Sequence, residues 1–460
     1  MSGLDLSGLF KRDVKSVSLF GFGRSAVALI PHLLSSGYSV TVRDDRAIDT
    51  RDLPSGVGCL SGASALKNVT EDVMIISPST RRDRFFSLGL DKRMILTSDT
   101  EIFFKAFTGK SFAISGSSGK STTSTLLYEL LSGGGAHLIG NIGVPMTHAL
   151  LTENITRAVC EISSFNLEYD EIGAYRATVT NIKRNHLNWH TDFDEYARAK
   201  LSLLSSVTWF SVNLDDEHTR SLSSLSSCYA CYSLKFDYNS LQKLYKDKII
   251  FTRGADGIYK NNRLIVPSSL ISGYPEYNIY NLLAALSLAE GEYDEDTLPE
   301  IISSHRSLSH RCEKFLTERG VDFIDSSIDT SPDRTYETLS SLSDSVILML
   351  GGRSKGESYS PLVSAVNKKC KSLYLFGEAR DKILSDMAGA KVPIYLFKTM
   401  REATIAALSA SGVGDTLLLS PASTSFDEFS SFEVRGDSFK KIVKDALGQE
   451  NTGEENEKVN

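Results

Sequence analysis

The sequence predicts an α/β protein with three successive domains, each containing a mainly parallel sheet. Two observations support this fold class. Short runs rich in β-branched residues alternate with amphipathic segments of helical period, which is typical of parallel strands joined by helices. The alternation starts again near residue 110 and near residue 321 of the 460-residue chain. Each block is then roughly 100–200 residues long, which matches the usual size of a domain.

The strand candidates follow one another in each block. In the first block they are VSLFGFG, YSVTVRDD, DVMIISPS and RMILTSD, with RSAVALIPHLLSSG as the helix after the first strand. In the second block they are KSFAISGSSGKS, RAVCEISS and RATVTNI. In the third they are VDFIDSS, SVILMLGG, SLYLFGEA, VPIYLF and DTLLLSPAS. We therefore expect domains over residues 1–106, 107–308 and 309–447, followed by a polar, disordered tail over 448–460.

The composition excludes several classes of protein. Hydrophobic residues make up 41% of the chain and charged residues 23%, as in ordinary soluble globular proteins. A net charge of −7 argues against a nucleic-acid or anionic-membrane partner, and no apolar run reaches the roughly 18 residues of a transmembrane helix. Six scattered cysteines and the lack of a signal-peptide pattern indicate a reducing cytoplasm. The CxxC pair Cys228 and Cys231 is interpreted as strand filler rather than a metal site.

The first glycine-rich turn, GFGRSA, follows an apolar run and precedes a helical pattern. Gly21 and Gly23 have the spacing of a Rossmann turn, and Asp44 and Asp45 follow about twenty residues later, where an acid would hydrogen-bond a ribose hydroxyl. One interpretation is a nucleotide or dinucleotide site. The other is a tight turn between a strand and a helix that binds nothing, and this motif alone does not decide between them.

The second glycine-rich turn, SGSSGKSTT, predicts a phosphate-binding loop. It lies between a strand and a helix, although Ile114 stands where the usual GxxxxGK[ST] loop has its first glycine. Backbone amides at a helix N-terminus can surround an anion, Lys120 adds a positive charge, and a hydroxyl can bind Mg²⁺. The residues expected to surround the phosphates are Gly116, Ser117, Ser118, Gly119, Lys120, Ser121 and Thr122.

Two further strand ends carry side chains suited to a metal ion. Glu161 in RAVCEISS comes directly after the apolar residues of a strand and offers the carboxylate that Mg²⁺ usually takes in addition to phosphates. His186 in NHLNWH follows the next strand. A salt bridge for the glutamate and a structural role for the histidine are the competing explanations.

Lys200 in YARAKLSLL lies at helical spacing from apolar residues. It shares a helix face with Phe193, Tyr196, Ala197 and Leu204. From this pattern alone we expect the side chain to extend along the apolar surface until its ammonium reaches water. The alternative is a buried lysine of lowered pKa, whose neutral amine reacts with CO₂ to form a carbamate and so becomes an oxygen ligand.

Taken together, these motifs resemble those of the Mur ligases, and most closely the branch that adds D-glutamate. The similarity runs in order through nearly the whole chain, without the extreme N-terminus and the polar tail. The stretches EISSF, GNIG and LSPASTSFDEFSSFEVRGDSF are specific to the D-glutamate branch. The other matching stretches are GFGRSA with RDDR, GSSGKST, GNIGVP, EISSFNLE, NHLNWH, YARAK, YNIYNLLAALSLA, SHRCE and GGRSKG.

The resemblance implies a Rossmann-like N-terminal domain, a central P-loop ATPase domain and a C-terminal Rossmann-like domain. It further implies ATP-dependent addition of D-glutamate to UDP-N-acetylmuramoyl-L-alanine through an acyl phosphate, by a cytoplasmic monomer in peptidoglycan precursor synthesis. The implied cofactors are ATP, two Mg²⁺ ions and a CO₂-derived carbamate on Lys200.

The resemblance also assigns site residues by motif. Lys120, Glu161, His186 and Lys200 are the implied catalytic residues, and Ser121, Glu161, His186 and carbamylated Lys200 the implied metal ligands. Besides the phosphate loop, ATP would contact Asn278, Asn281 and Arg311. The implied D-glutamate contacts are Thr330, Lys355, Ser425 and Phe432. The UDP-substrate contacts are Arg24, Ser25, Asp44, Asp45, Ser77, Ser79, Asn141, Ser163, Ser164 and Asn166.

This chain departs from the family pattern at several positions. Ser326 and Ile328 replace a ribose-contacting aspartate and a lysine, with Asp325 and Asp329 as candidates to compensate. Tyr277 stands where a histidine is usual. We interpret these as lineage variation. The alternatives are a sister ligase that adds another amino acid, a degenerate ligase that acts as a binding protein, and a nicotinamide-dependent oxidoreductase built on GFGRSA.

Overall fold

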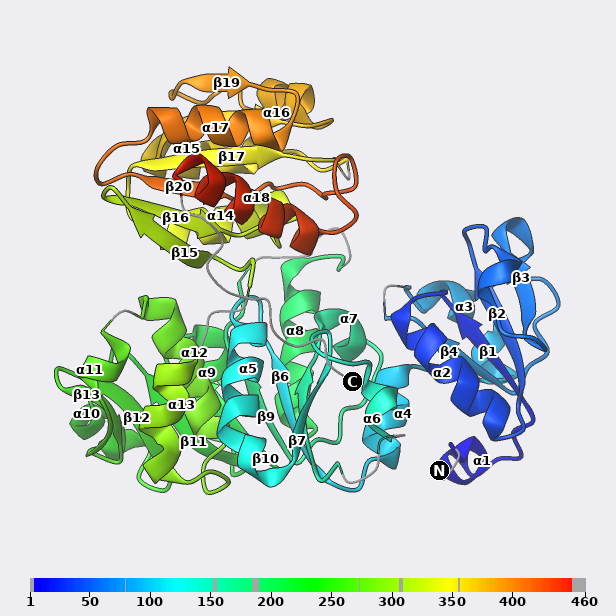
Figure 1. The fold of residues 1–460 in the computed structure, drawn as a ribbon. Helices are drawn as coiled ribbons and strands as arrows, with labels where there is room; N and C mark the ends of the chain where they lie inside the picture. The colour runs from blue at the N-terminus through cyan, green and yellow to red at the C-terminus, as the bar shows by residue number, and fades with distance from the viewer. Residues whose placement is uncertain are drawn as a thin grey trace, which may run out of the picture. The chain divides into compact units, whose positions relative to one another are not determined.

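The protein is described by a computed structural model that divides into two compact units, Met1–His305 and Arg306–Asn460. The residues that the structure describes are 4–78, 80–150, 152, 155–183, 190–272, 274–305, 309–354 and 356–448. The first unit contains two sheets and the second unit one (Figure 1).

The N-terminal sheet is parallel throughout and has the strand order β3-β2-β1-β4-β5. This order, with β1 in the centre and the chain continuing outward on both sides, is that of a nucleotide-binding α/β fold. Its strands are β1 Ser16–Phe20, β2 Ser39–Asp44, β3 Gly58–Ser61, β4 Val73–Ile76 and β5 Ile95–Thr97. Its helices are α1 Leu6–Phe10, α2 Arg24–Ser35, α3 Asp83–Ser87 and α4 Asp99–Ala106.

The central sheet has nine strands in the order β14-β13-β12-β11-β10-β9-β6-β8-β7. The pairs from β7 to β12 are parallel, whereas β12, β13 and β14 form an antiparallel extension. The parallel strands are β6 Lys110–Ser115, β7 Ala136–Gly140, β8 Arg157–Glu161, β9 Arg176–Val179, β10 Trp209–Asn213, β11 Cys228–Ser233 and β12 Ile249–Gly254. The two further strands of the extension are β13 Gly257–Lys260 and β14 Arg263–Pro267, of which β14 is at the edge of the sheet.

Helices cover both faces of the central sheet because its buried strands are apolar on both sides. Along β6, Phe112 and Ile114 belong to one core while Ala113 belongs to the other. Helices α5 (Lys120–Leu131) and α12 (Glu276–Leu288) lie side by side on the first of these faces (Figure 1). The remaining helices are α6 Met146–Leu150, α7 Ser164–Leu167, α8 Phe193–Ser205, α9 Glu217–Arg220, α10 Tyr238–Leu244, α11 Ser268–Ile271 and α13 Leu298–Ser304.

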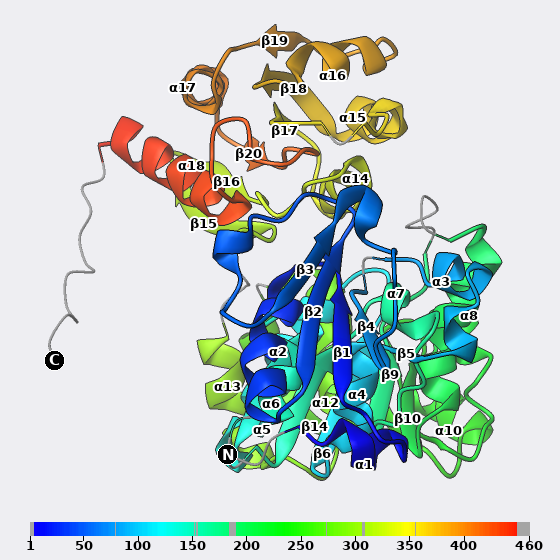
Figure 2. The same cartoon turned by 90° about the vertical axis from the view of Figure 1, so that its right-hand side faces the viewer.

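The second unit contains a six-stranded sheet in the order β15-β16-β20-β17-β18-β19. Only the β15–β16 pair is antiparallel. Helices α14 to α16 pack on one face and α17 and α18 on the other (Figure 2). The strands are β15 Glu313–Glu318, β16 Val321–Asp325, β17 Val346–Gly351, β18 Cys370–Phe376, β19 Ile394–Leu396 and β20 Thr416–Leu419. The helices are α14 Pro332–Ser341, α15 Val363–Lys369, α16 Arg380–Asp386, α17 Met400–Ala410 and α18 Phe432–Ala446.

The predicted α/β class is confirmed, and every strand candidate quoted above contains a strand. Strands β3, β7, β10, β12, β13, β14 and β15 were not among the predicted candidates. In the antiparallel extension, β13 and β14 are only four and five residues long and partly exposed, so they have no long apolar run. The expected domain boundaries at 106 and 308 stay predictions. Within the described ranges, no helix combines the length and apolar character that a bilayer crossing requires.

One buried arginine holds the edge of the N-terminal sheet together. The Arg43 side chain on β2 is 2% exposed and makes an ion pair of 2.8 Å with Glu71, whose side chain is 8% exposed. Its guanidinium also donates to the carbonyl oxygens of Ala65, Lys67 and Asn68 at 2.9, 3.1 and 3.3 Å. All these partners lie in the segment that leads into β4, so a single cation fixes that connection.

We expect Arg43→Ala to destabilise the N-terminal sheet by about 3–5 kcal/mol, because it leaves the Glu71 carboxylate buried without a cation. Hydrogen exchange of the β1, β2 and β4 amides measures the stability of this sheet alone. A local measurement is needed because a chain with several domains does not unfold in a single two-state transition. The matched control is Arg51→Ala, which removes an exposed ion pair to Asp49 and should change little. Equal effects of the two substitutions would contradict the assigned role of Arg43.

Candidate active site

The second glycine-rich turn connects β6 to α5 at the carboxyl end of the central sheet. Gly116 has a φ of +146° and Gly119, which precedes α5, a φ of +80°. A Cβ at Gly116 would collide with the Thr180 side chain, and one at Gly119 with the Asn281 side chain. Both positions therefore require glycine for conformation and for space.

Part of this turn is held by Asn181, which follows the neighbouring strand β9. The amide of Ser117 donates to the Asn181 carbonyl at 2.9 Å, and the amide of Ser118 to the Asn181 side-chain oxygen at 3.1 Å. These two amides were among those expected to surround an anion. The first-turn amides of α5 from Lys120 onward, which have no acceptor within the helix, are better placed for phosphate oxygens.

Lys120 and Ser121 begin α5 beside the turn. The Lys120 ammonium donates to the Gly116 carbonyl at 2.9 Å and lies 3.4 Å from the Ser117 carbonyl. Ser121 is buried, whereas Thr122 is half-buried. A cation and a buried hydroxyl thus lie next to the loop, as the sequence predicted.

Glu161 ends β8, the strand next to β6 in the sheet. In the sheet, Glu161 is paired with Ile114 on β6, so its carboxylate lies at the end of the strands, directly beside the phosphate loop. The residue is 5% exposed, and its Oε2 atom has no hydrogen-bond partner among the described residues. A buried carboxylate oxygen without a partner is costly, and a hard cation would compensate it. The donor set of Glu161 and Ser121 therefore fits Mg²⁺.

Lys200 on α8 points back to the same loop and does not reach water. The residue is 2% exposed, and its ammonium donates to the Gly116 carbonyl at 2.9 Å and lies 3.4 Å from the Ser115 hydroxyl. Burial lowers the pKa of Lys200 well below its ordinary value, the positive charge of Lys120 lowers it further, and Glu161 only partly opposes this. The expectation of a side chain extending to solvent is therefore wrong.

Two of the residues predicted to contact ATP, Asn278 and Asn281, lie on α12. Asn281 is buried, its oxygen is 3.4 Å from the Thr123 hydroxyl, and its amide donates to Asn278 at 3.3 Å. These contacts place both asparagines beside the first turns of α5. Tyr277, where the family pattern has a histidine, is exposed at the start of α12.

The predicted substrate residues of the central sheet surround α7. Ser163 caps this helix, and its hydroxyl donates to the Asn166 oxygen at 2.6 Å. Asn166 in turn donates to the Thr100 hydroxyl on α4 at 2.7 Å. The hydroxyl of Ser164 is buried without a partner among the described residues. Asn141 is exposed, and its amide donates to the Glu161 carbonyl at 3.2 Å.

The first glycine-rich turn is hydrogen-bonded to Asp44, the acid predicted to accompany it. The amide of Phe22 donates to Asp44 at 2.9 Å, and Arg46 also bonds to this carboxylate. Burial works against ionisation of Asp44, but these hydrogen bonds outweigh it and lower its pKa. Asp45 makes an ion pair of 2.6 Å with Arg84. The remaining predicted residues here are Arg24 and Ser25, which begin α2, and Ser77, which follows β4.

The predicted residues of the second unit lie near the carboxyl ends of β16 and β20. Ser425 is buried, Arg311, Thr330 and Phe432 are half-buried, and Phe432 begins α18. His186, Lys355 and Ser79 lie outside the described residues.

The two aspartates considered as replacements for the missing acid are both engaged within the second unit. Asp325 is fully buried and bonds to His310 at 2.6 Å and to the Ser327 amide at 2.9 Å. Asp329 accepts from the hydroxyls of Thr338 and Ser420, each at 2.8 Å. Both carboxylates therefore have structural partners.

Sequence reasoning missed two residues that shape the loop. Asn181 bonds to Ser117 and Ser118, and the Tyr196 hydroxyl lies 2.7 Å from the Ser117 hydroxyl. A polar residue directly after β9 was the available signal for Asn181, since the carboxyl ends of parallel strands meet at one sheet edge. Tyr196 reads as an ordinary core residue from its spacing alone.

Two protein families match this chain. Residues 114–289 match the Mur ligase middle domain, and residues 310–423 match the Mur ligase, glutamate ligase domain. In solved structures, the fold is similar to that of UDP-N-acetylmuramate-alanine ligase from Thermotoga maritima, with a TM-score of 0.57 at 15% identity, covering 95% of this chain and 100% of that one. A pseudomurein peptide ligase type C from Methanothermus fervidus gives a TM-score of 0.53 at 16% identity, covering 94% and 99%.

Full-length relatives decide the family. The chain is 31% identical to an Acetivibrio thermocellus protein, covering 94% of this chain and 97% of the relative. It is 32% identical to one from Ruminiclostridium cellulolyticum, covering 94% and 98%. The chain belongs to the Mur ligase family. Within that family, both of these relatives are UDP-N-acetylmuramoylalanine–D-glutamate ligases.

We expect Gly119→Ala to weaken ATP binding about tenfold or more. A residue with a side chain costs about 1–2 kcal/mol in the left-handed conformation, and the new Cβ would push Asn281 away from the loop. Titration with a fluorescent ATP analogue measures the effect. Gly173→Ala is the control, because its Cβ would meet no atom of the described residues within 4 Å. Unchanged affinity of the Gly119 variant would contradict this geometry of the loop.

Proposed function

We propose that this protein joins D-glutamate to UDP-N-acetylmuramoyl-L-alanine and converts ATP to ADP and phosphate. The observation that carries the proposal is the buried pair of Glu161 and Lys200 at the phosphate loop. A carboxylate oxygen without a partner and a lysine of lowered pKa at one sheet edge are typical of a site for charged phosphates and metal ions. The names of the full-length relatives support the choice of substrates.

The reaction needs ATP because a carboxylate is a poor electrophile. Transfer of the γ-phosphoryl group to the terminal carboxylate of the UDP substrate forms an O–P bond, breaks the bond to ADP and gives an acyl phosphate. The amine of D-glutamate then attacks the carbonyl carbon and forms the C–N bond. The tetrahedral intermediate collapses with loss of inorganic phosphate, and the amine proton passes to solvent. Exclusion of water protects the acyl phosphate from hydrolysis.

In this proposal the phosphate loop binds and orients the nucleotide. The first-turn amides of α5 and the Lys120 ammonium bind phosphate oxygens and neutralise their charge. Ser121, Glu161 and His186 would hold two Mg²⁺ ions, which supply further charge neutralisation on the phosphates. Asn278 and Asn281 contact the adenine side of the nucleotide, and Arg311 contacts its phosphates.

Lys200 serves this site as a carbamate. Its lowered pKa keeps the amine neutral, so the nitrogen lone pair can bond to the carbon of CO₂ while the amine loses a proton to solvent. The product carries a negative charge, so an anion takes the place of the neutral amine next to the Lys120 ammonium. The carbamate attracts that ammonium and adds oxygen ligands for a metal ion.

The other substrates would bind to further sets of residues. The UDP end contacts the first glycine-rich turn, with Arg24, Ser25, Asp44, Asp45, Ser77 and Ser79. The muramoyl end contacts Asn141, Ser163, Ser164 and Asn166, among which the buried Ser164 hydroxyl has no partner in the described part of the chain. D-Glutamate contacts Thr330, Lys355, Ser425 and Phe432. We further propose that the enzyme is a cytoplasmic monomer.

The function is tested by phosphate release from ATP in bicarbonate buffer with Mg²⁺ and UDP-N-acetylmuramoyl-L-alanine. We expect release that depends on D-glutamate and a product whose mass increases by one glutamyl residue. L-Glutamate, L-lysine and meso-diaminopimelate are the amino-acid controls. Release with one of these instead would identify a sister ligase, and no release with any of them would identify a binding protein.

We expect Lys200→Ala to reduce turnover at least about 100-fold, the scale for losing one preorganised charge at a reacting centre. Short-chain carboxylic acids should restore part of the activity, because they can occupy the position of the carbamate. Arg198→Ala on the exposed side of the same helix is the control and should remain active. Normal turnover of the Lys200 variant, or loss of activity without rescue, would contradict the carbamate.

A further inference from the structure

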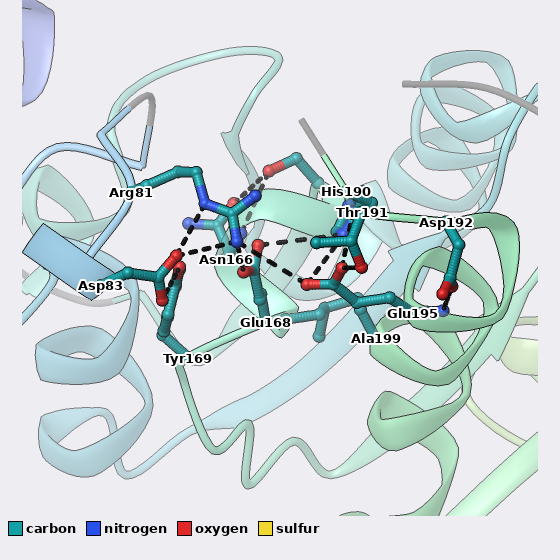
Figure 3. A network of polar contacts seen from close by, with 12 residues as sticks. Arg81, Asp83, Asn166, Glu168, Tyr169, His190, Thr191, Asp192, Glu195 and Ala199 are labelled. Carbon is teal, nitrogen blue, oxygen red and sulfur yellow. Dashed lines mark hydrogen bonds and ion pairs between the residues drawn. The ribbon is translucent and has the colours of Figure 1, made fainter. Parts of the chain in front are cut away.

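A second group of metal-binding side chains lies at the beginning of α8. Glu168 directly follows α7, Glu195 lies in the first turn of α8, and His190 precedes that helix. One ligand atom from each lies within 4.8 Å of the others. Figure 3 shows the two carboxylates and the imidazole facing one another, with Arg81 reaching in from the segment before α3.

The imidazole of His190 is the feature that points to a ligand. Its side chain is completely buried, and neither ring nitrogen has a hydrogen-bond partner among the described residues. The Nδ1 atom lies 3.9 Å from Glu168 Oε2 and 4.0 Å from Glu195 Oε1, too far for hydrogen bonds. Burial lowers the pKa of His190 despite the two acids, so the ring is in the neutral form that binds metals.

The nearby cations, Arg81 and Lys200, have other partners than the imidazole of His190. Arg81 pairs with the carboxylates, at 3.3 Å from Glu168, 3.8 Å from Glu195 and 2.8 Å from Asp83. Lys200 is directed to the phosphate loop. A guanidinium N–H could donate to a ring-nitrogen lone pair, but among the described residues neither nitrogen of His190 takes part in a hydrogen bond. Arg81 thus pairs with the two acids, while neither imidazole nitrogen has a hydrogen-bond partner among the described residues.

A second cluster, in the other unit, shows the difference. His310, Glu313 and Asp325 also bring three ligand atoms together. There, however, the imidazole bonds to Asp325 at 2.6 Å, and Lys440 pairs with Glu313. Those groups satisfy one another, so that cluster carries no argument for a metal ion.

We propose that Glu168, His190 and Glu195 form a site for a divalent transition-metal ion of the Zn²⁺ class, which displaces Arg81 when it binds. Zinc takes nitrogen and carboxylate ligands at about 2.0–2.2 Å, which places tetrahedral ligands about 3.3 Å apart. Side-chain shifts of roughly half an ångström would bring the observed 3.9 and 4.0 Å separations to that value. This group shares no residue with the site proposed for Mg²⁺ at the phosphate loop.

Metal binding here would change a connection within the first unit. Arg81 ties the segment after β4 to α7 and to the first turn of α8, the helix that carries Lys200. A bound ion takes over both carboxylates and releases Arg81 to Asp83. The site would therefore couple metal binding to the contact between the N-terminal sheet and α8.

Calorimetric titration of the full chain with ZnCl₂, in excess Mg²⁺, tests the site. We expect one Zn²⁺ equivalent that is lost in His190→Gln and kept in His137→Gln, a control on β7. X-ray absorption of the zinc-loaded protein should show one imidazole ligand for that equivalent. Equal zinc binding by the wild-type protein and His190→Gln would overturn the proposal.

A second variant separates metal binding from misfolding. Arg81→Gln removes the competing cation, so we expect it to bind Zn²⁺ about fivefold more tightly, the equivalent of about 1 kcal/mol for a partly exposed ion pair. A gain in affinity cannot arise from a damaged fold. Unchanged or weaker binding by Arg81→Gln would contradict displacement of Arg81 and overturn the proposal.

Discussion

The cost of removing the Lys200 ammonium from water is the constraint on which the central site depends. The residue is 2% exposed, and the positive Lys120 disfavours its charge as well. Glu161, itself buried, opposes this only in part. The fold holds these groups together because β6, β8 and α8 converge on one sheet edge, where the Gly116 carbonyl accepts from both lysines. The net charge of such a site would change if a phosphate or a metal ion bound there, or if Lys200 became a carbamate.

The same edge is tied to the N-terminal sheet by buried polar contacts. Arg82 pairs with Asp170, to which the Ser98 hydroxyl also donates. Asn166 bonds to Thr100, and Arg81 reaches Glu168. These contacts join α7 to the segment before α3 and to the start of α4. The surroundings of the proposed zinc site are therefore part of the connection between the two sheets of the first unit.

One departure from the family pattern, Ser326, has a local explanation in the second unit. Ser326 is fully buried, and its hydroxyl accepts from the Cys312 amide at 3.0 Å. Asp325 and Asp329 are held by His310 and by neighbouring hydroxyls. An aspartate brought in at 326 would place another carboxylate near these two, where like charges repel. The serine therefore fits its surroundings, and neither neighbouring acid is available for a ligand without breaking such contacts.

The sequence by itself determined the α/β class, the order of the predicted strands along the chain, and the residue types at the phosphate loop. Hydrophobic period and glycine spacing are local properties, so Gly116, Gly119 and Lys120 could be recognised without a fold. Only the tertiary structure decided that Lys200 is buried and that His190 lies between two acids, with no hydrogen-bond partner in the described part of the chain. Burial and pKa depend on what packs around a side chain from distant parts of the chain, which no local pattern contains.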